Sequence, residues 1–333
     1  MILVRPNFQS LKDFGSLVIK MDVDELKNDN MSGALEICVK AAGILQYEIE
    51  RIDIATGKRL QSRLLDLGIK IIISQPRMAP LYNLVNEVLL ACEKSGDPEM
   101  FRKSAKGLVD DFLIRLSASE KAILRQCENL IRSPARIATY SRSSTVIKTL
   151  LALFDSGVLA EVLLCESRPM LEGKRAAAEL AASGVPVSFF VDAAMDEMVA
   201  RCDLVLVGAD SFSEEKLINK IGTKALTLVA RQRQKPVYAL ATMPKFLPSS
   251  IAMPAEPEHG QNEVWANPPR NVRVVNHYFE QVAADCFDGI ITEEGIFDKR
   301  DLEKIVGGKS YHSALVSKLA ELGKQSQGNP GIF

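Results

Sequence analysis

The pattern of hydrophobic positions divides the chain into two parts with different periods. Up to about residue 131, apolar side chains recur every three or four positions, which predicts an amphipathic helix over 31–54 and one helix, or two in sequence, over 97–131. The apolar segment between them is interrupted at Gln75-Pro76-Arg77, because a proline disfavours helical structure at the residue before it. The first part is therefore predicted to be a helical N-terminal domain over residues 1–133.

After residue 134, short apolar runs alternate with helical patterns. The predicted strands are Arg136–Tyr140, Ala160–Cys165, Val185–Val191, Leu204–Gly208, Pro236–Ala241, Val272–Val275 and Gly289–Thr292. The helical patterns fall at 145–155, 171–183, 193–201, 218–233 and 311–323. This alternation predicts an α/β domain over 134–333, with a Rossmann-like open parallel sheet and helices on both faces. Residues 247–271, rich in Pro, Asn, Glu and Ser, predict a long loop.

Composition narrows the class of protein. Of the 333 residues 47% are hydrophobic, as in globular proteins, and no apolar run is long enough to span a bilayer. A net charge of −1 gives no electrostatic reason to expect a nucleic-acid or membrane partner. Six scattered cysteines and three histidines show no zinc-ligand spacing and are typical of free thiols in a reducing compartment. We therefore expect a cytoplasmic protein without a metal or other cofactor.

Polar side chains follow the first two predicted strands. Ser141, Arg142 and Ser143 open a helix, where hydroxyls, a guanidinium and free amides suit a phosphate. The same serines are also what an ordinary helix N-cap requires. After the second strand, Glu166 and Arg168 could clamp a ligand or form a structural ion pair. Because parallel sheets bind ligands at the carboxyl ends of their strands, both places are candidate parts of one site.

The turn Gly208-Ala209-Asp210 follows the most apolar predicted strand. Small residues let the backbone turn closely there, and a carboxylate at this edge can act as an acid or base if its pKa is raised. An Asp that only caps the turn is the alternative. Asn219 and Lys220 near a helix start, and Lys245 after the next strand, should converge on the same rim. Lysines suit phosphate whereas Asp and Asn suit hydroxyls, so the expected ligand is a phosphorylated, hydroxyl-bearing molecule.

Four sequence blocks resemble a known family, and they occur in that family's order. The blocks are Cys165–Pro169 with Glu172-Gly173, Val207–Asp210, Asn219–Thr223 and Ile291–Gly295. The chain is similar, from about Ser32 to Ile305, to the superfamily of the alpha, beta and delta subunits of translation initiation factor 2B. This superfamily includes methylthioribose-1-phosphate isomerase and ribose-1,5-bisphosphate isomerase. The resemblance implies a helical domain before a Rossmann-like domain, assembled as a homodimer or higher oligomer.

The resemblance also implies roles for individual residues. Asp210 matches the aspartate with which the isomerases convert an aldose 1-phosphate to a ketose 1-phosphate. Asn219 and Lys220 match a substrate-binding pair, and Lys245 falls where the bisphosphate isomerases have a lysine.

The chain departs from the isomerase pattern at three positions. Ser141 stands where the isomerases have a catalytic cysteine, and a serine hydroxyl is far less acidic than a thiol. Ser32 and Gln75 stand where the isomerases have phosphate-binding arginines. Arg77 or Arg142 could supply the missing positive charge.

Two functions follow from these matches and departures. The leading hypothesis is a non-standard or regulatory family member that binds a phosphorylated sugar or nucleotide without the usual isomerisation, as Ser141 suggests. The alternative is an active aldose–ketose sugar-phosphate isomerase that uses Asp210. A third possibility, a translation factor that contacts other proteins, has no independent support in the charge of the chain.

Overall fold

The computed structural model describes residues 22–29, 32, 34–51, 57–131, 133–253, 258–306 and 308–328. Its contacts divide the chain into two units. One contains the described residues up to Gln75 together with Leu84–Ser117, and the other contains Pro76–Asn83 and the described residues from Ala118 onward. The predicted domain boundary at Ser133 and Pro134 falls between a helix and the first sheet strand, and it stays a prediction.

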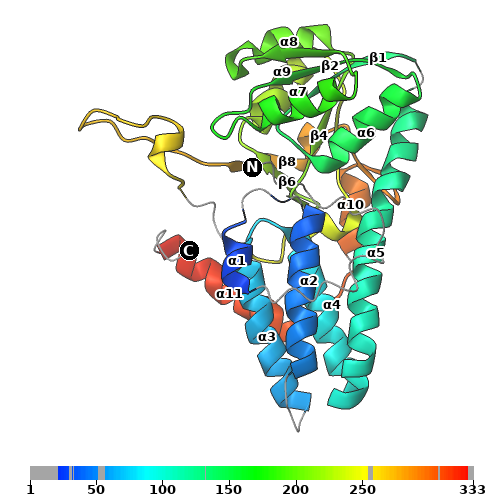
Figure 1. Cartoon of the computed structure of the whole chain (residues 1–333), viewed down its shortest axis with the longest axis vertical. Helices are drawn as coiled ribbons and strands as arrows, with labels where there is room; N and C mark the ends of the chain where they lie inside the picture. The colour runs from blue at the N-terminus through cyan, green and yellow to red at the C-terminus, as the bar shows by residue number, and fades with distance from the viewer. Residues whose placement is uncertain are drawn as a thin grey trace. The chain divides into compact units, whose positions relative to one another are not determined.

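The first unit is built on helices (Figure 1). They are α1 (Val23–Lys27), α2 (Ala34–Arg51), α3 (Gly57–Ser74), α4 (Ala79–Ser95) and α5 (Pro98–Leu130), of which α4 and α5 continue into the second unit. The two long helices predicted from periodicity are confirmed as α2 and α5. The predicted interruption is also confirmed, because α3 ends at Ser74 and α4 begins at Ala79.

The second unit contains a seven-stranded sheet of order β10-β9-β7-β4-β1-β2-β3. Its strands are β1 (Ala135–Thr139), β2 (Leu159–Cys165), β3 (Val187–Phe190), β4 (Leu204–Gly208), β7 (Val237–Leu240), β9 (Gly289–Thr292) and β10 (Gly295–Phe297). All pairs are parallel except β9 with β10. The chain proceeds from β1 outward to β3 and then returns to β4 on the other side of β1. The carboxyl ends of β1 and β4 therefore flank the switch in strand order, where such sheets bind ligands.

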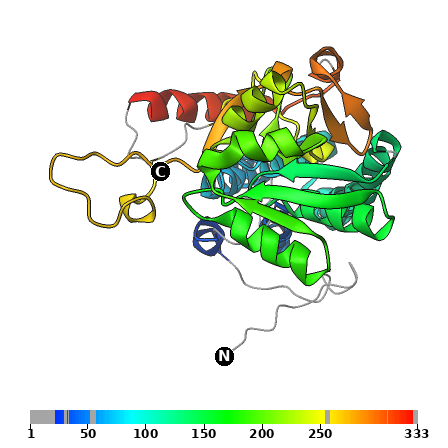
Figure 2. The same ribbon diagram turned by 90° about the horizontal axis from the view of Figure 1, so that it is seen from above.

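Helices cover both faces of this sheet, as predicted (Figure 2). Successive strand side chains point to opposite faces, so Leu204 and Leu206 belong to one buried cluster and Val205 and Val207 to the other. The first cluster is completed by the end of α5, α6 (Ser144–Asp155) and α7 (Glu172–Ala182). The second is completed by α8 (Met195–Arg201), α9 (Thr223–Gln232) and α10 (Lys299–Val306). Burial on both faces explains why these strands are continuous apolar runs.

A small antiparallel sheet was not predicted. It consists of β5 (Ser211–Phe212), β6 (Lys216–Lys220) and β8 (Phe279–Ala283). The prediction of a helix from residue 218 is wrong at its start, since Asn219 and Lys220 pair with β8 and α9 begins only at Thr223. The intervening Gly222 has φ of 103°, a conformation that favours glycine and ends the strand.

The predicted strand at Val272–Val275 is wrong as well. This segment belongs to a long loop over 258–276 that extends away from the sheet in Figures 1 and 2. Val275 is 56% exposed, and β-branched residues form no strand without a neighbouring strand to pair with. The last helix, α11 (Ser313–Gly328), follows the loop and α10. In the described part of the chain, no helix combines the length and apolarity that crossing a bilayer requires.

Candidate functional site

The ends of β1 and β4 meet at the start of α6. Ser143 caps this helix, because its side chain accepts a hydrogen bond from the Val146 amide. A Cβ added to Gly208 would lie 2.5 Å from the Ser143 Cβ, so only glycine fits at the end of β4. The N-cap interpretation of Ser143 is thus confirmed, while phosphate binding by Ser141, Arg142 and Ser143 stays a prediction.

The turn carrying Asp210 is fixed to the turn carrying Lys245. The buried Lys245 Nζ donates a hydrogen bond to the Ala209 carbonyl oxygen over 2.6 Å. The Asp210 amide donates to the Ile218 carbonyl oxygen over 2.9 Å, and Asp210 itself is half-buried. An ammonium group therefore lies beside the backbone of the candidate catalytic carboxylate, as the convergence of strand ends predicts.

The side chain of Asn83 binds the backbone of the turn that carries Lys245, and this role of Asn83 was not predicted. Its side-chain amide donates to the carbonyl oxygens of Pro244, at 2.6 Å, and Phe246, at 2.9 Å. Its Oδ1 accepts a hydrogen bond from the Tyr311 hydroxyl. No sequence signal links Asn83 to a turn more than 150 residues away, since only the fold brings them together.

Lys220 forms the most buried ion pair of the site. Its Nζ lies 2.8 Å from Glu172 Oε1, with side-chain exposures of 3% for the lysine and 18% for the glutamate. The ammonium group also lies 5.3 Å from the centre of the Tyr278 ring, a cation–π contact. Asn219 is buried and donates to Thr223 Oγ1 over 3.0 Å. Both residues of the predicted binding pair are thus held rigidly at the end of β6.

Breaking the ion pair of Lys220 with Glu172 should lower the stability of the protein. We expect Lys220→Met to lower the free energy of unfolding by about 2 kcal/mol, because it leaves a half-buried carboxylate without its cation. Urea unfolding measures this loss. Glu172→Gln in the same chain should restore part of it, and Lys224→Met, an exposed lysine on α9, serves as the control. Equal unfolding midpoints for the Lys220 and Lys224 variants would contradict the prediction.

Ser141 lies in a tightly bonded loop cluster. Its amide donates to Ser167 Oγ over 2.8 Å, and Ser141 and Ser167 both have positive φ. The carboxylate of Asp192 in turn accepts from the amides of Ser167 and Arg168. Burial, and then the negative charge of Asp192, raise the pKa of Tyr140, which is hydrogen-bonded to Asp192. Asp192 thus orders the loop after β2, a role that the sequence analysis missed.

Two polar atoms of the site are buried without a hydrogen-bond partner among the described residues. They are Glu172 Oε2, beside Lys220, and Thr242 Oγ1, just after β7. Buried polar atoms in proteins are usually hydrogen-bonded, so each is a free position for a ligand hydroxyl. The sequence analysis noted Glu172 only in a family block and did not single out Thr242.

The structure does not support a Glu166–Arg168 ion pair. The Arg168 guanidinium instead donates to the carbonyl oxygens of Glu263, at 3.1 Å, and Val264, at 3.0 Å, within the long loop. Arg142 forms an ion pair with Glu179 of α7. Ligand binding by Glu166, Arg168 and Arg142 therefore stays a prediction, and Arg142 and Arg168 already have partners.

Gln75 and Arg77 lie in the interruption between α3 and α4. The Gln75 amide donates to the carbonyl oxygens of Leu26, at 2.9 Å, and Asp29, at 3.1 Å, within the first unit. Arg77 is buried in the second unit. Phosphate binding by either residue stays a prediction.

The second unit thus offers a carboxylate, two buried ammonium groups and unused hydrogen-bonding positions at the carboxyl ends of its strands. Buried cations can bind an anion, and a half-buried carboxylate such as that of Asp210 can exchange a proton with a hydroxyl. Among the described residues, no group of three or more His, Cys, Asp or Glu is arranged to hold a metal ion. This set suits proton transfer on a bound phosphorylated molecule.

Comparisons with known proteins show the family of the chain. The model of the Initiation factor 2 subunit family matches residues 30–299. A protein named ribose 1,5-bisphosphate isomerase from Pyrococcus furiosus is 30% identical over 288 residues, which cover 82% of this chain and 88% of the relative. A protein of the same name from Methanocaldococcus jannaschii is 27% identical and covers 84% of this chain and 91% of its own length.

Solved structures give the same result. The crystal structure of translation initiation factor eIF-2B from Pyrococcus horikoshii OT3 has a TM-score of 0.71 at 28% identity, covering 84% of this chain and 97% of the other. The 5-methylthioribose 1-phosphate isomerase of the same organism shares the fold, with a TM-score of 0.67 at 21% identity over 86% of this chain and 87% of its own. With a family model that matches most of the chain, and with the family's sequence blocks at the strand ends, this protein belongs to the initiation factor 2 subunit family.

Proposed function

We propose that this protein is an aldose–ketose isomerase whose substrate is a phosphorylated pentose of the ribose 1,5-bisphosphate type. The observation that most supports this proposal is the hydrogen bond from Lys245 to the Ala209 carbonyl oxygen, next to Asp210. It occurs in a chain that is 30% identical to a protein named ribose 1,5-bisphosphate isomerase. The curated relatives favour this function over the binding or regulatory role that the departures from the isomerase pattern suggest.

The proposed reaction rearranges one molecule and needs no external reagent. The sugar ring opens, the hydrogen on C2 moves to C1, and the C2 hydroxyl becomes the carbonyl of the ketose. The hydrogen leaves C2 with its bonding electrons and replaces the broken bond between C1 and the ring oxygen. In the same rearrangement a proton passes from the C2 hydroxyl through Asp210 to the ring oxygen, so the Asp210 carboxyl group ends in the state in which it began. Lys245 and Lys220 hold the phosphate groups, and Glu172 Oε2 accepts a hydrogen bond from a sugar hydroxyl.

Ser141 favours a second candidate function, binding without turnover. In the resemblance to the family it stands where the isomerases have their catalytic cysteine. The nearest thiol in sequence at a strand end is Cys165, whose pKa is raised by burial to about 12 and whose Sγ contacts the Met198 sulfur. Cys165 is therefore a protonated, buried thiol at neutral pH and cannot act as an acid–base group there.

Restoring the thiol separates the two functions. Ser141→Cys should bind ribose 1,5-bisphosphate as the wild type does and raise kcat by on the order of a hundredfold, because a more acidic group then assists proton transfer. Ribulose 1,5-bisphosphate formation is measured for both proteins. Ser144→Cys, at the first position of α6, is the matched control and should leave kcat unchanged. If the wild type binds the substrate without turning it over, the binding function is correct instead, whether or not Ser141→Cys is active.

We also propose that the protein forms a homodimer or higher homo-oligomer in the cytoplasm. The long loop exposes several large apolar side chains, including Trp265, Val272 and Val275, which monomers rarely leave uncovered. All six cysteines are free thiols, as in reducing compartments.

A further inference from the structure

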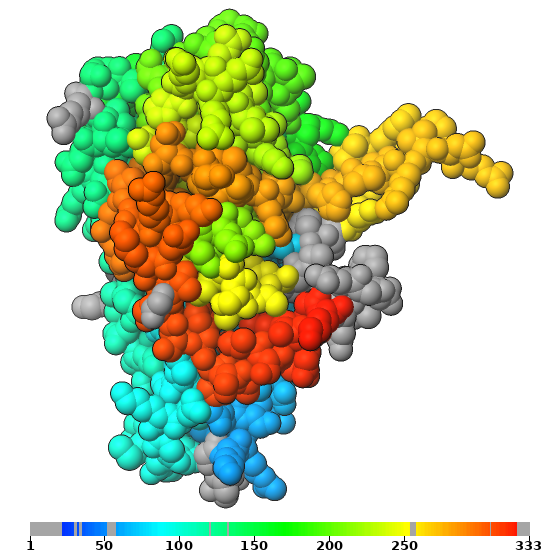
Figure 3. Space-filling view, turned by 180° about the vertical axis from the view of Figure 1, so that it is seen from behind, coloured from blue at the N-terminus to red at the C-terminus, as the bar shows by residue number. Residues whose placement is uncertain are grey.

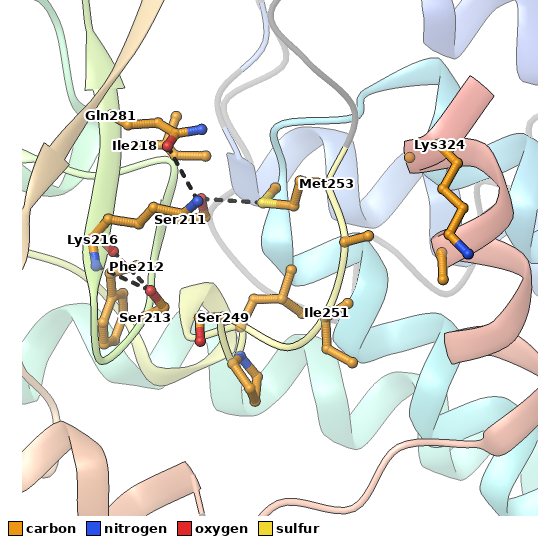
Figure 4. Close-up of a pocket in the computed structure, with 15 residues that line it drawn as sticks. Ser211, Phe212, Ser213, Lys216, Ile218, Ser249, Ile251, Met253, Gln281 and Lys324 are labelled. Carbon is orange, nitrogen blue, oxygen red and sulfur yellow. Dashed lines mark hydrogen bonds between the residues drawn. The ribbon is translucent and has the colours of Figure 1, made fainter. Parts of the chain in front are cut away.

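A cavity of about 480 Å³ lies in the second unit, outside the candidate site. Figure 4 shows its walls, which come from the small sheet, the segment 247–253 and the helix α11. These segments are distant in sequence, and Figure 3 shows them adjoining on one face, in light green, yellow and red. The volume is in the range of small-molecule sites. Asp210 does not line this cavity, so it is separate from the residues proposed for catalysis.

The floor of the cavity is apolar and preformed. Phe212, Ile218, Leu247 and Ile251 line it and are all buried. Met253 also lines the cavity, and its sulfur accepts a hydrogen bond from the Ser211 hydroxyl over 3.7 Å. Water gains few hydrogen bonds over such a surface, so an apolar molecular body replaces it favourably.

The charged groups of the rim are all positive. Lys216 of β6 and Lys324 of α11 lie at opposite sides of the cavity, and no acidic residue is among the described residues that line it (Figure 4). Lys216 Nζ donates only to the neutral amide oxygen of Gln281, over 3.2 Å. The nearby Glu214 carboxylate is already bonded to the amide and hydroxyl of Ser249. Positive charge at this rim is therefore not neutralised by a described carboxylate.

The floor is continuous with both turns of the candidate site. Ser211 directly follows Asp210, and Leu247 lies two residues after Lys245. The Leu247 amide donates to the Phe212 carbonyl oxygen over 2.9 Å, and Phe212 forms a parallel bridge with Phe246. A molecule that fills the cavity therefore packs against the segments that position Asp210 and Lys245.

We propose that this cavity is an effector site for a small amphipathic organic anion, with an apolar body on the Phe212–Leu247 floor and its negative group at the rim that carries Lys216 and Lys324. Its occupancy stabilises the two turns and so changes the affinity of the candidate site for its own ligand. The binding itself is independent of the proposed isomerase function, and only the coupling rests on it.

The binding is tested with the fluorescent anion 8-anilinonaphthalene-1-sulfonate, and octanoate is used to displace it. We expect one saturable site per chain. The double variant Lys216→Gln/Lys324→Gln should weaken binding roughly tenfold or more, since each lysine contributes a charged contact. Ala320→Trp, on the α11 wall, should fill the cavity and abolish binding. Lys318→Gln and Ser317→Trp, on α11 but outside the lining, are the matched controls.

The outcomes separate the parts of the proposal. Equal affinity in all variants, or displacement by neutral octanol as effective as by octanoate, would overturn the anion site. The coupling is measured as the dissociation constant of ribose 1,5-bisphosphate with and without saturating octanoate, and we expect a severalfold change. An unchanged constant overturns the effector role while leaving the anion site, whereas no bisphosphate binding at all is a failure of the proposed isomerase function.

Discussion

Asp210→Asn is expected to lower the kcat of ribose 1,5-bisphosphate isomerisation by a factor of about 10²–10⁴, the usual contribution of an acid–base group. The amide has nearly the shape of the carboxylate but cannot accept and return a proton at neutral pH. The bond from the residue 210 amide to the Ile218 carbonyl oxygen does not depend on the side chain, so the turn should remain in place. Substrate binding should therefore persist while turnover is lost.

The measurement needs a control for the chemical change itself. Asp285→Asn makes the same replacement in the short turn before β9, at the opposite ends of the strands, and should leave kcat unchanged. Melting temperatures of both variants check that the fold is intact. Normal turnover in Asp210→Asn would remove Asp210 from the proposed mechanism.

Gly173→Ala is expected to lower the free energy of unfolding by about 3 kcal/mol, near the upper end for an overpacked core position. A Cβ at Gly173 would lie 1.8 Å from the Cys165 carbonyl oxygen and 3.0 Å from the Glu166 carbonyl carbon. These are backbone atoms at the end of β2, so they cannot rotate away as a side chain does. The helix α7 would have to shift, and with it the Glu172 partner of Lys220.

A glycine-to-alanine substitution in an uncrowded helix position should raise the free energy of unfolding instead. A Cβ at Gly107, inside α5, meets nothing within 4 Å. Gly107→Ala should therefore stabilise the protein by about 0.5–1 kcal/mol, because alanine is the better helix former. Urea unfolding of both variants gives the comparison. Similar stabilities for Gly173→Ala and the wild type would show that the contact between α7 and β2 is looser than the structure indicates.

The strands of the large sheet could be predicted because their sequence is constrained from both sides. A strand such as β4 is buried on both faces, so each of its positions must be apolar and the run stands out. The polar residues just after such strands were predicted to form the site for the same reason, since parallel strands end at one rim.

The small sheet could not be predicted in this way. β6 carries apolar residues beside Asn219 and Lys220, a short pattern that fits a strand or a helix start equally. Its identity is decided by pairing with β8, about 60 residues later. The segment Val272–Val275 was wrongly predicted as a strand for a related reason. Its residues have a high β propensity, but it pairs with no neighbouring strand and therefore lies in a loop.

The sequence by itself therefore determined the fold class, the rim of the sheet on which polar residues gather, and the family to which the chain belongs. These follow from local patterns, which burial imposes on every element separately. Only the tertiary structure decided which groups meet: Lys245 with Ala209, Lys220 with Glu172, and Asn83 with the turn around Lys245. Such contacts join residues far apart in sequence, and their energies depend on distance and burial, which no local pattern encodes.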